Sequence, residues 1–467
     1  MPPGAYLAIS LAALLCGYLL YGRLMARLMR PDNARPTPAC TMADGVDYVK
    51  MPAKSVFLIQ LLNIAGIGPV YGPILGALYG PWALVWIVLG SIFAGGVHDY
   101  FSGMLSVRRG GLSLPDVVGD HLGASMRRFM QVFSLVVVVL VGVVFVTGPA
   151  RLLSDMTAIP VMTWVVIIFA YYFLATILPI DVVIGRVYPI FAGSLLVMAV
   201  GLTAAFFVEG YATRAPLNWT APPADLPMWP LLFITIACGA ISGFHATQSP
   251  LMARCLPDER SGLPVFYGAM IAEGGLALIW ATLGMALYPD PQALHAAIAA
   301  GGPGKVVNDV SMELMGPVGG ILAILGVIVL PITSGDTAFR SARLTIADVL
   351  GVAQRERRRR LLIAVPLFAL GAALSQVNFE VIWRYFGWAN QVLATLVLWT
   401  VAAFLARGSK FHWPASLPAS FMTAVCATYI CHARIGLNLP LTVSSWMGGA
   451  AAVLTLALFL SRCRRKA

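Results

Sequence analysis

Apolar residues gather in thirteen windows of roughly 20 residues, the length that a helix needs to cross the hydrocarbon core of a membrane. A membrane-spanning barrel would show strands of about ten residues with alternating polarity instead. The pattern therefore predicts an all-α polytopic membrane protein. The predicted spans lie at about 5–22, 55–78, 82–106, 130–150, 161–180, 187–208, 230–253, 264–288, 316–339, 361–377, 381–405, 415–433 and 442–461.

Two of these windows have centres that are unsuited to a continuous helix. The stretch 231–251 reads LLFITIACGAISGFHATQSPL, with Gly239, Gly243 and Pro250 in its middle, and the stretch 64–73 reads IAGIGPVYGP. A helix in lipid must pair its backbone groups internally, because hydrocarbon offers no partners. We therefore expect both helices to be broken where the freed groups face protein, water or a ligand.

The two breaks occupy equivalent places in two sets of five spans. The window 55–78 enters from the cytoplasm, and 230–253, five crossings later, enters from outside, which makes the repeats inverted. Gly and Pro are common in membrane helices for packing reasons, but paired breaks in inverted halves point to a transporter's binding site. Half-helix N-termini there can hold an anion, and loose carbonyls can hold a cation.

This topology divides the chain into four parts. They are an N-terminal helix with a cytoplasmic loop (1–54), inverted repeat one (55–208), inverted repeat two (230–405), and two C-terminal helices with a basic tail (415–467). The fold expected is a LeuT-like core of five plus five helices, with one extra helix before it and two after it.

Charge and composition fit a membrane protein and exclude a soluble class. Only 11% of the residues are charged, against about 25% in soluble domains, and 59% are hydrophobic. The net charge of +11 suggests nucleic acid in a soluble protein, but most Lys and Arg lie on one side of the predicted spans. That bias predicts a periplasmic N-terminus and a cytoplasmic C-terminus in a bacterial inner membrane. The basic run at 355–360 can attract acidic lipid headgroups, although a topology anchor explains it more simply.

Polar residues inside the spans supply the candidate chemistry. His245 lies in the second break and Glu273 in the span 264–288, where an ionised group is costly and a functional role is the default. Asp99 can relay a proton or pair with Arg108 or Arg109. Asp336 can be protonated, while the nearby hydroxyls can form a cation site with carbonyls at 64–68. The expected ion-coupling residues are Asp99, Glu273, Thr333, Ser334 and Asp336.

The breaks themselves supply the candidate substrate contacts. We expect substrate to lie between Gly66, Gly68, Pro69, Tyr71, Gly72, Ser242, Gly243, Phe244, His245 and Gln248. Each polar residue can instead have a purely structural role, since a serine or histidine in a helix commonly donates a hydrogen bond to a nearby carbonyl. Asn390 and Gln391 are weaker candidates that can serve helix packing. A hydrolase built from Ser242, His245 and Asp336 is conceivable, but no spacing places these three together.

Several motifs resemble the carbon starvation protein A (CstA) family. They are DGVDYV (44–49), IAGIGPVYGP (64–73), AGGVHDY (94–100), VRRGG (107–111), ISGFHA (241–246), YGAMIAE (267–273) and FGWANQVLA (386–394). The resemblance implies an inner-membrane carrier of peptides or pyruvate with the five-plus-five fold of the amino acid–polyamine–organocation superfamily. Two departures stand out. The chain has fewer C-terminal spans than longer relatives, and FLIQLLN at 57–63 lacks the paired histidines that many members place there.

These features together predict a secondary active transporter that imports small carboxylates such as pyruvate, or short peptides, by proton symport and alternating access. The alternatives are a sodium-coupled symporter of a similar solute and a membrane nutrient sensor that does not transport. We expect no enzyme activity, no cofactor, no metal and no nucleic-acid partner. The expected partners are the substrate, a coupling proton (or sodium) and membrane lipid, and the sequence sets no oligomeric state.

Overall fold

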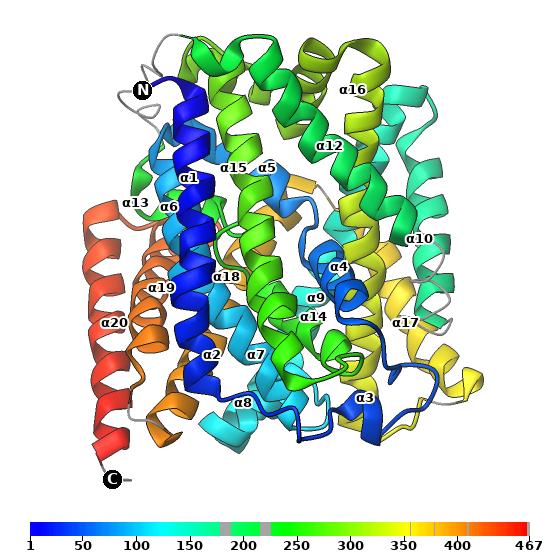
Figure 1. Cartoon of the computed structure of the whole chain (residues 1–467), viewed down its shortest axis with the longest axis vertical. Helices are drawn as coiled ribbons and strands as arrows, with labels where there is room; N and C mark the ends of the chain where they lie inside the picture. Colours follow the sequence, from blue (N-terminus) through cyan, green and yellow to red (C-terminus); the bar gives the residue numbers. More distant parts are fainter. Residues whose placement is uncertain (178–187, 215–225, 355, 378, 409–410, 465–467) are drawn as a thin grey trace.

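The computed structural model describes residues 1–467 except 178–187, 215–225, 355, 378, 409–410 and 465–467, and it is a bundle of helices (Figure 1). The helices of the first half are α1 (Pro3–Gly17), α2 (Arg23–Met29), α3 (Pro38–Thr41), α4 (Ala53–Ile64), α5 (Gly68–Gly76), α6 (Trp82–Leu89), α7 (Gly96–Arg108), α8 (Leu114–Leu122), α9 (Ala124–Thr157), α10 (Val161–Ile177) and α12 (Tyr188–Val208). Those of the second half are α13 (Met228–Thr235), α14 (Gly243–Ala253), α15 (Ala269–Leu287), α16 (Pro291–Leu350), α17 (Arg357–Leu374), α18 (Phe379–Gly408), α19 (Trp413–His432) and α20 (Leu441–Arg464).

Nine helices in the described part of the chain are long and apolar enough to cross a membrane, and the bent pair α4–α5 makes a tenth. The other three predicted spans correspond to the shorter helix α10, the broken pair α13–α14, and helix α17, which begins with four arginines. Every predicted span thus coincides with helix apart from the two breaks, and residues 178–180 and 187, at the ends of two spans, lie outside the described residues. Thirteen crossings stay a prediction. The divisions at 54, 208, 230, 405 and 415 likewise stay predictions.

The segment between the predicted spans 264–288 and 316–339 is itself largely helical. The 60-residue helix α16 begins there and has non-helical backbone at Gly301, Gly302 and Gly316. The last two have φ of +70° and +63°, a region that residues with a Cβ rarely adopt. The glycines therefore divide α16 into two short segments followed by one long segment that runs the height of the bundle (Figure 1).

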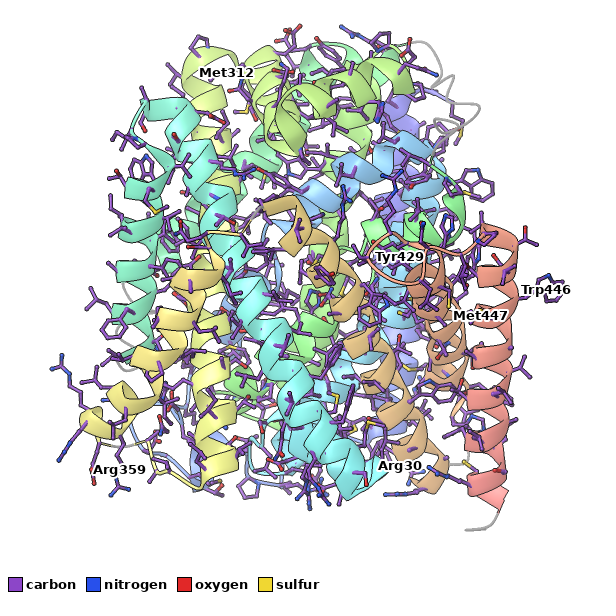
Figure 2. The ribbon with its side chains drawn as sticks, turned by 180° about the vertical axis from the view of Figure 1, so that it is seen from behind. Arg30, Met312, Arg359, Tyr429, Trp446 and Met447 are labelled. Carbon is purple, nitrogen blue, oxygen red and sulfur yellow. The ribbon has the colours of Figure 1, made fainter. Side chains whose placement is uncertain are left out.

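The chain ends lie at opposite ends of the bundle's long axis (Figure 1). The last helix, α20, packs against α19 at the edge and turns Trp446 away from the bundle (Figure 2). The core lies where the broken helices α4–α5 and α13–α14 meet the surrounding α7, α9, α15, α16 and α18. In Figure 1 α4 leads upward into α5, and α13 leads downward into α14, as inverted repeats require.

Candidate functional site

The second break is held open by two neighbouring residues of α18. The Asn390 side-chain oxygen accepts the Phe244 backbone N–H at 2.7 Å, at the start of α14. The Gln391 amide donates to the Phe233 carbonyl at 2.9 Å, near the end of α13. Free N–H groups at a helix start and free carbonyls at a helix end both need partners. One dipeptide thus satisfies both ends of the break.

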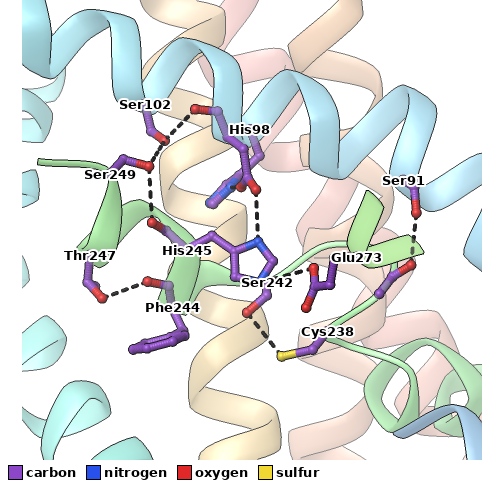
Figure 3. Close-up of polar contacts among 12 residues, drawn as sticks. Ser91, His98, Ser102, Cys238, Ser242, Phe244, His245, Thr247, Ser249 and Glu273 are labelled. Carbon is purple, nitrogen blue, oxygen red and sulfur yellow. Dashed lines mark hydrogen bonds and ion pairs between the residues drawn. The ribbon is translucent and has the colours of Figure 1, made fainter. Parts of the chain in front are cut away.

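Carbonyls of the unwound segment 236–242 find partners on the second span of repeat one. The indole of Trp86 donates to the Ile236 carbonyl at 2.9 Å, and the Ser91 hydroxyl donates to the Gly239 carbonyl at 2.8 Å. Gly239 has φ of +87°, so the turn of the chain here favours glycine. The Ser91 contact is visible in Figure 3. The break is therefore a built feature of the fold with its backbone groups paired.

The first break is tied to α16. The hydroxyls of Thr333 and Ser334 both lie against the Leu62 carbonyl, at 2.9 and 3.0 Å. These hydroxyls therefore meet a carbonyl of the first broken helix, two residues before the predicted 64–68. The two hydroxyls and this carbonyl contribute three oxygens at one point.

The two breaks pack directly on one another through glycine. A Cβ on Gly68 would lie 2.4 Å from the Cys238 sulfur, and one on Gly72 would lie 2.9 Å from the Thr235 carbonyl oxygen. Distances below 3.0 Å are closer than real Cβ atoms approach, so these glycines permit the contact. Gly66 similarly faces the Phe145 ring. The two broken helices are therefore in direct contact, and a binding site between them stays a prediction.

A chain of four fully buried ionisable side chains lies beside the second break (Figure 3). Asp99 on α7 contacts Nδ1 of His98 at 2.6 Å through one oxygen and Nδ1 of His245 at 2.8 Å through the other. On its far side, Nε2 of His245 lies 3.4 Å from a carboxylate oxygen of Glu273 on α15. The structure therefore joins three of the predicted residues, from both repeats, into one continuous arrangement.

The geometry of this chain favours a proton between His245 and Glu273. With Asp99 ionised, both of its oxygens accept, so Nδ1 of each histidine carries a hydrogen. Nε2 of His245 would then present a lone pair to the Glu273 carboxylate, and two buried acceptors facing each other are repulsive. A proton on either His245 or Glu273 removes the conflict. In the part of the chain that the structure describes, no Lys or Arg forms an ion pair with these side chains.

The pairing of Asp99 with Arg108 or Arg109 is wrong. Arg108 lies 3.2 Å from Glu259, and Arg109 pairs with Asp120. Both arginines are thus paired with other carboxylates, and Asp99 is left to the histidines. The hydrogen-bond partners of Asp99 were harder to predict than its burial, because its second histidine partner is 146 residues away in the sequence.

Asp336 and Ser242 occupy separate environments. Asp336 accepts from the Tyr171 hydroxyl at 3.0 Å. Ser242 exchanges hydrogen bonds with Asn390 and accepts one from the Cys238 thiol. Neither has His245 among its hydrogen-bond partners within the described residues. The Ser242–His245–Asp336 triad is therefore not assembled.

The remaining predicted substrate contacts are buried around the breaks. Tyr71 packs near Trp383, and Phe244 packs edge-on against Phe145. The Gln248 amide donates to Thr247, while its oxygen has no hydrogen-bond partner. The other predicted contacts here, also buried, are Gly66, Gly68, Pro69, Gly72, Ser242 and Gly243.

Two further residues have chemical features in this region that the sequence did not indicate. Gln60 is fully buried, and neither its amide nitrogen nor its oxygen has a hydrogen-bond partner among the described residues. Cys238, expected to be a small core residue, offers its sulfur within 4.8 Å of donor atoms on His245 and Glu273, a set that can hold a divalent metal. No sequence spacing signals that grouping, because Glu273 comes from another helix.

Comparison with known proteins adds the family. A sequence profile described as "Carbon starvation protein CstA" matches residues 5–161, 146–299 and 292–429. The chain belongs to the CstA family. This CstA-family chain is 44% identical over 353 residues to an "Uncharacterized membrane protein" of Haemophilus influenzae, covering 64% of the chain and 95% of that protein. It is 25% identical over 554 residues to the "Peptide transporter CstA" of Escherichia coli, covering 88% of the chain and 78% of that protein.

The fold has a solved counterpart. A mutant manganese transporter of Eremococcus coleocola superimposes with a TM-score of 0.58 at 13% identity, covering 91% of this CstA-family chain and 99% of that chain. The expected all-helical, LeuT-like architecture is confirmed, and the family resemblance with it. The chain is a multi-pass membrane transporter.

Proposed function

We propose that this chain is a secondary active transporter of the bacterial inner membrane that imports small carboxylates, such as pyruvate, or short peptides. Its N-terminus is periplasmic and its C-terminus cytoplasmic. Family membership and the name of the Escherichia coli relative, a peptide transporter, support the peptide part of this proposal. We propose that transport is driven by proton symport and proceeds by alternating access.

The observation that carries the proton assignment is the contact between His245 and Glu273. The two side chains are fully buried, belong to α14 and α15, and lie 3.4 Å apart across the second break. A proton held there can be released only when the break opens to water. Because the break and α15 must separate to exchange that proton, protonation and helix movement are coupled.

Substrate is proposed to bind between the breaks, where glycines of α5 bring it close to the end of α13 and to the unwound segment before α14. α5 begins at Gly68 and α14 begins at Gly243, and both helix starts lie at the breaks. The positive ends of these two half-helices favour a carboxylate. Both pyruvate and the C-terminus of a peptide carry that group.

Sodium coupling is the second candidate, and one observation favours it. Thr333 and Ser334 converge on the Leu62 carbonyl, and three oxygens at one point suit a hard cation. Asp336, two residues further along α16, is bonded to Tyr171 and makes a second buried protonation point. Proton coupling is preferred because the four-residue chain around His245 already needs a proton, whereas the hydroxyls are satisfied by protein.

The experiment is uptake of labelled pyruvate, dipeptide and tripeptide into proteoliposomes, with pH and sodium gradients imposed separately. We expect one substrate to accumulate under a pH gradient in sodium-free medium. Accumulation only under a sodium gradient would favour the Thr333–Ser334 site. Substrate binding without accumulation under either gradient would instead favour a sensor.

A further inference from the structure

Three buried side chains of different chemistry converge beside the second break (Figure 3). Cys238 lies in the unwound segment before α14, His245 lies on α14, and Glu273 lies on α15. The Cys238 sulfur, a ring nitrogen of His245 and a carboxylate oxygen of Glu273 all lie within 4.8 Å of one another. Thiolate, imidazole and carboxylate are the ligands that zinc takes in proteins, so the set has the composition of a zinc-class site.

Two of these side chains present unused lone pairs to each other. Nε2 of His245 and both carboxylate oxygens of Glu273 are buried without a hydrogen-bond partner among the described residues. Nε2 and the nearer carboxylate oxygen lie 3.4 Å apart. Two nitrogen or oxygen ligands of a tetrahedral zinc ion, each about 2.1 Å from it, lie about 3.4 Å from one another. The separation of the two atoms thus already fits a shared ion.

Asp99 supports the histidine from behind, as metal sites require. A histidine that binds a metal through one ring nitrogen usually donates the other N–H to a carboxylate, which fixes the tautomer and the ring. Nδ1 of His245 lies 2.8 Å from an Asp99 oxygen, so the lone pair of Nε2 is left to face Glu273. The arrangement therefore includes an outer partner as well as ligands.

The Cys238 sulfur completes the set from the contact between the two breaks. A Cβ on Gly68 would lie 2.4 Å from this sulfur, and the thiol donates to the Ser242 hydroxyl at 3.4 Å. A zinc–sulfur bond of about 2.3 Å places sulfur about 3.5 Å from the other ligands, so the sulfur must approach by roughly 1 Å at most. On binding, the thiol proton is released and a sulfur–metal bond forms. The divalent ion, the thiolate and the carboxylate together carry no net charge, which suits a buried place.

We propose that Cys238, His245 and Glu273 bind a divalent transition-metal ion of the zinc class. Three protein ligands leave a fourth position for water or for a carboxylate. The ion would tie the second break to α15 and so oppose the separation that transport needs. The ligand set is independent of the proposed function. Entry of the ion into the finished protein rests on that function, because the enclosed ligands become accessible only when the break opens.

The test loads the purified full chain with cobalt(II), which occupies zinc sites and absorbs light. Cobalt is supplied in the growth medium or after purification, and unbound ion is removed by gel filtration. We expect wild type to retain about one ion per chain and to show the strong near-ultraviolet absorption of a cobalt–thiolate bond. Cys238→Ser should lose this absorption. The matched control Cys426→Ser, which alters a buried cysteine beside Thr395, should keep it.

A wild-type chain without cobalt–thiolate absorption under both loading conditions would overturn the proposal, and so would persistence of the absorption in Cys238→Ser. Glu273→Gln removes an anionic ligand and should weaken cobalt binding by at least about tenfold. Unchanged cobalt affinity in Glu273→Gln would overturn the site even if Cys238→Ser failed to fold. Loading only during growth would support the site and contradict the opening of the break, so failure of the site and failure of the proposed function are distinguishable.

Discussion

Nδ1 of His245 lies 2.8 Å from a carboxylate oxygen of Asp99, and both side chains are fully buried. His245 belongs to the half-helix that follows the break in repeat two, and Asp99 belongs to the second span of repeat one. The hydrogen bond therefore joins the two repeats at the place where one of them is interrupted. It also orients the histidine ring, so that Nε2 faces Glu273.

Asn390 should be needed to keep the second break in shape. Replacing it with alanine removes the acceptor for the Phe244 N–H and a partner of Ser242. Loss of such a cap costs about 1–2 kcal/mol, so we expect Asn390→Ala to lower the free energy of unfolding by that amount and to reduce uptake. The control is Thr400→Val on the same helix, because among the described residues the Thr400 hydroxyl donates only to the Leu396 carbonyl of its own turn. Equal loss in the two variants would contradict the capping role.

Gly72 should not tolerate a methyl group. An alanine Cβ there would meet the Thr235 carbonyl oxygen at 2.9 Å, and backbone cannot rotate aside as a side chain can. Overpacking of this kind costs about 1–3 kcal/mol, and we expect Gly72→Ala to lose that stability in chemical unfolding. Gly387→Ala is the matched control, because its nearest atom would be 3.9 Å away, on Ile234. Normal stability of Gly72→Ala would show that the breaks are not in contact.

Asp47 should give a pH-dependent contribution to stability. Burial alone would raise the pKa of Asp47, but the charges of Arg343 and Arg340 outweigh burial and hold the pKa below its ordinary value. A carboxyl with a lowered pKa in the folded state stabilises the fold above its unfolded pKa, about 3.9. That stability is lost as pH falls through the folded pKa.

We therefore expect Asp47→Asn to cost about 3 kcal/mol or more at neutral pH. The difference from wild type should shrink as pH falls below about 4. Thermal unfolding across this range measures it, with the exposed Asp155→Asn as control. A difference that stays constant with pH would mean that the ion pairs contribute nothing to stability.

Much of the fold could be predicted because the length and low polarity of a membrane-spanning helix are visible in the sequence. The breaks at Gly239–Pro250 and Ile64–Pro73 were predictable because glycine and proline disrupt a backbone that lipid cannot satisfy. Their mutual contact followed from the inverted topology. The helical structure of 291–315 was not predicted, since its polar and glycine-rich sequence is typical of a loop.

The partners of each polar group could not be predicted. Asn390 and Gln391 resemble ordinary packing residues until the ends of α13 and α14 are seen to lie beside them. Asp99 had nearby arginines in the sequence, yet its partners are His98 and a histidine from the other repeat. Such contacts depend on how helices pack across the bundle, and hydrophobic pattern specifies which face is buried rather than which atoms meet.

The most direct test of the account is substrate-driven proton entry into proteoliposomes, followed with a pH-sensitive dye trapped inside. Adding the transported substrate to wild type should acidify the lumen, and Glu273→Gln and His245→Ala should each slow this by about tenfold or more, while remaining folded. Glu313→Gln, which alters an outer carboxylate bonded to Tyr211, should leave the rate unchanged. Substrate entry without acidification in wild type, or wild-type rates in both site variants, would contradict the claim that the His245–Glu273 pair carries the coupling proton.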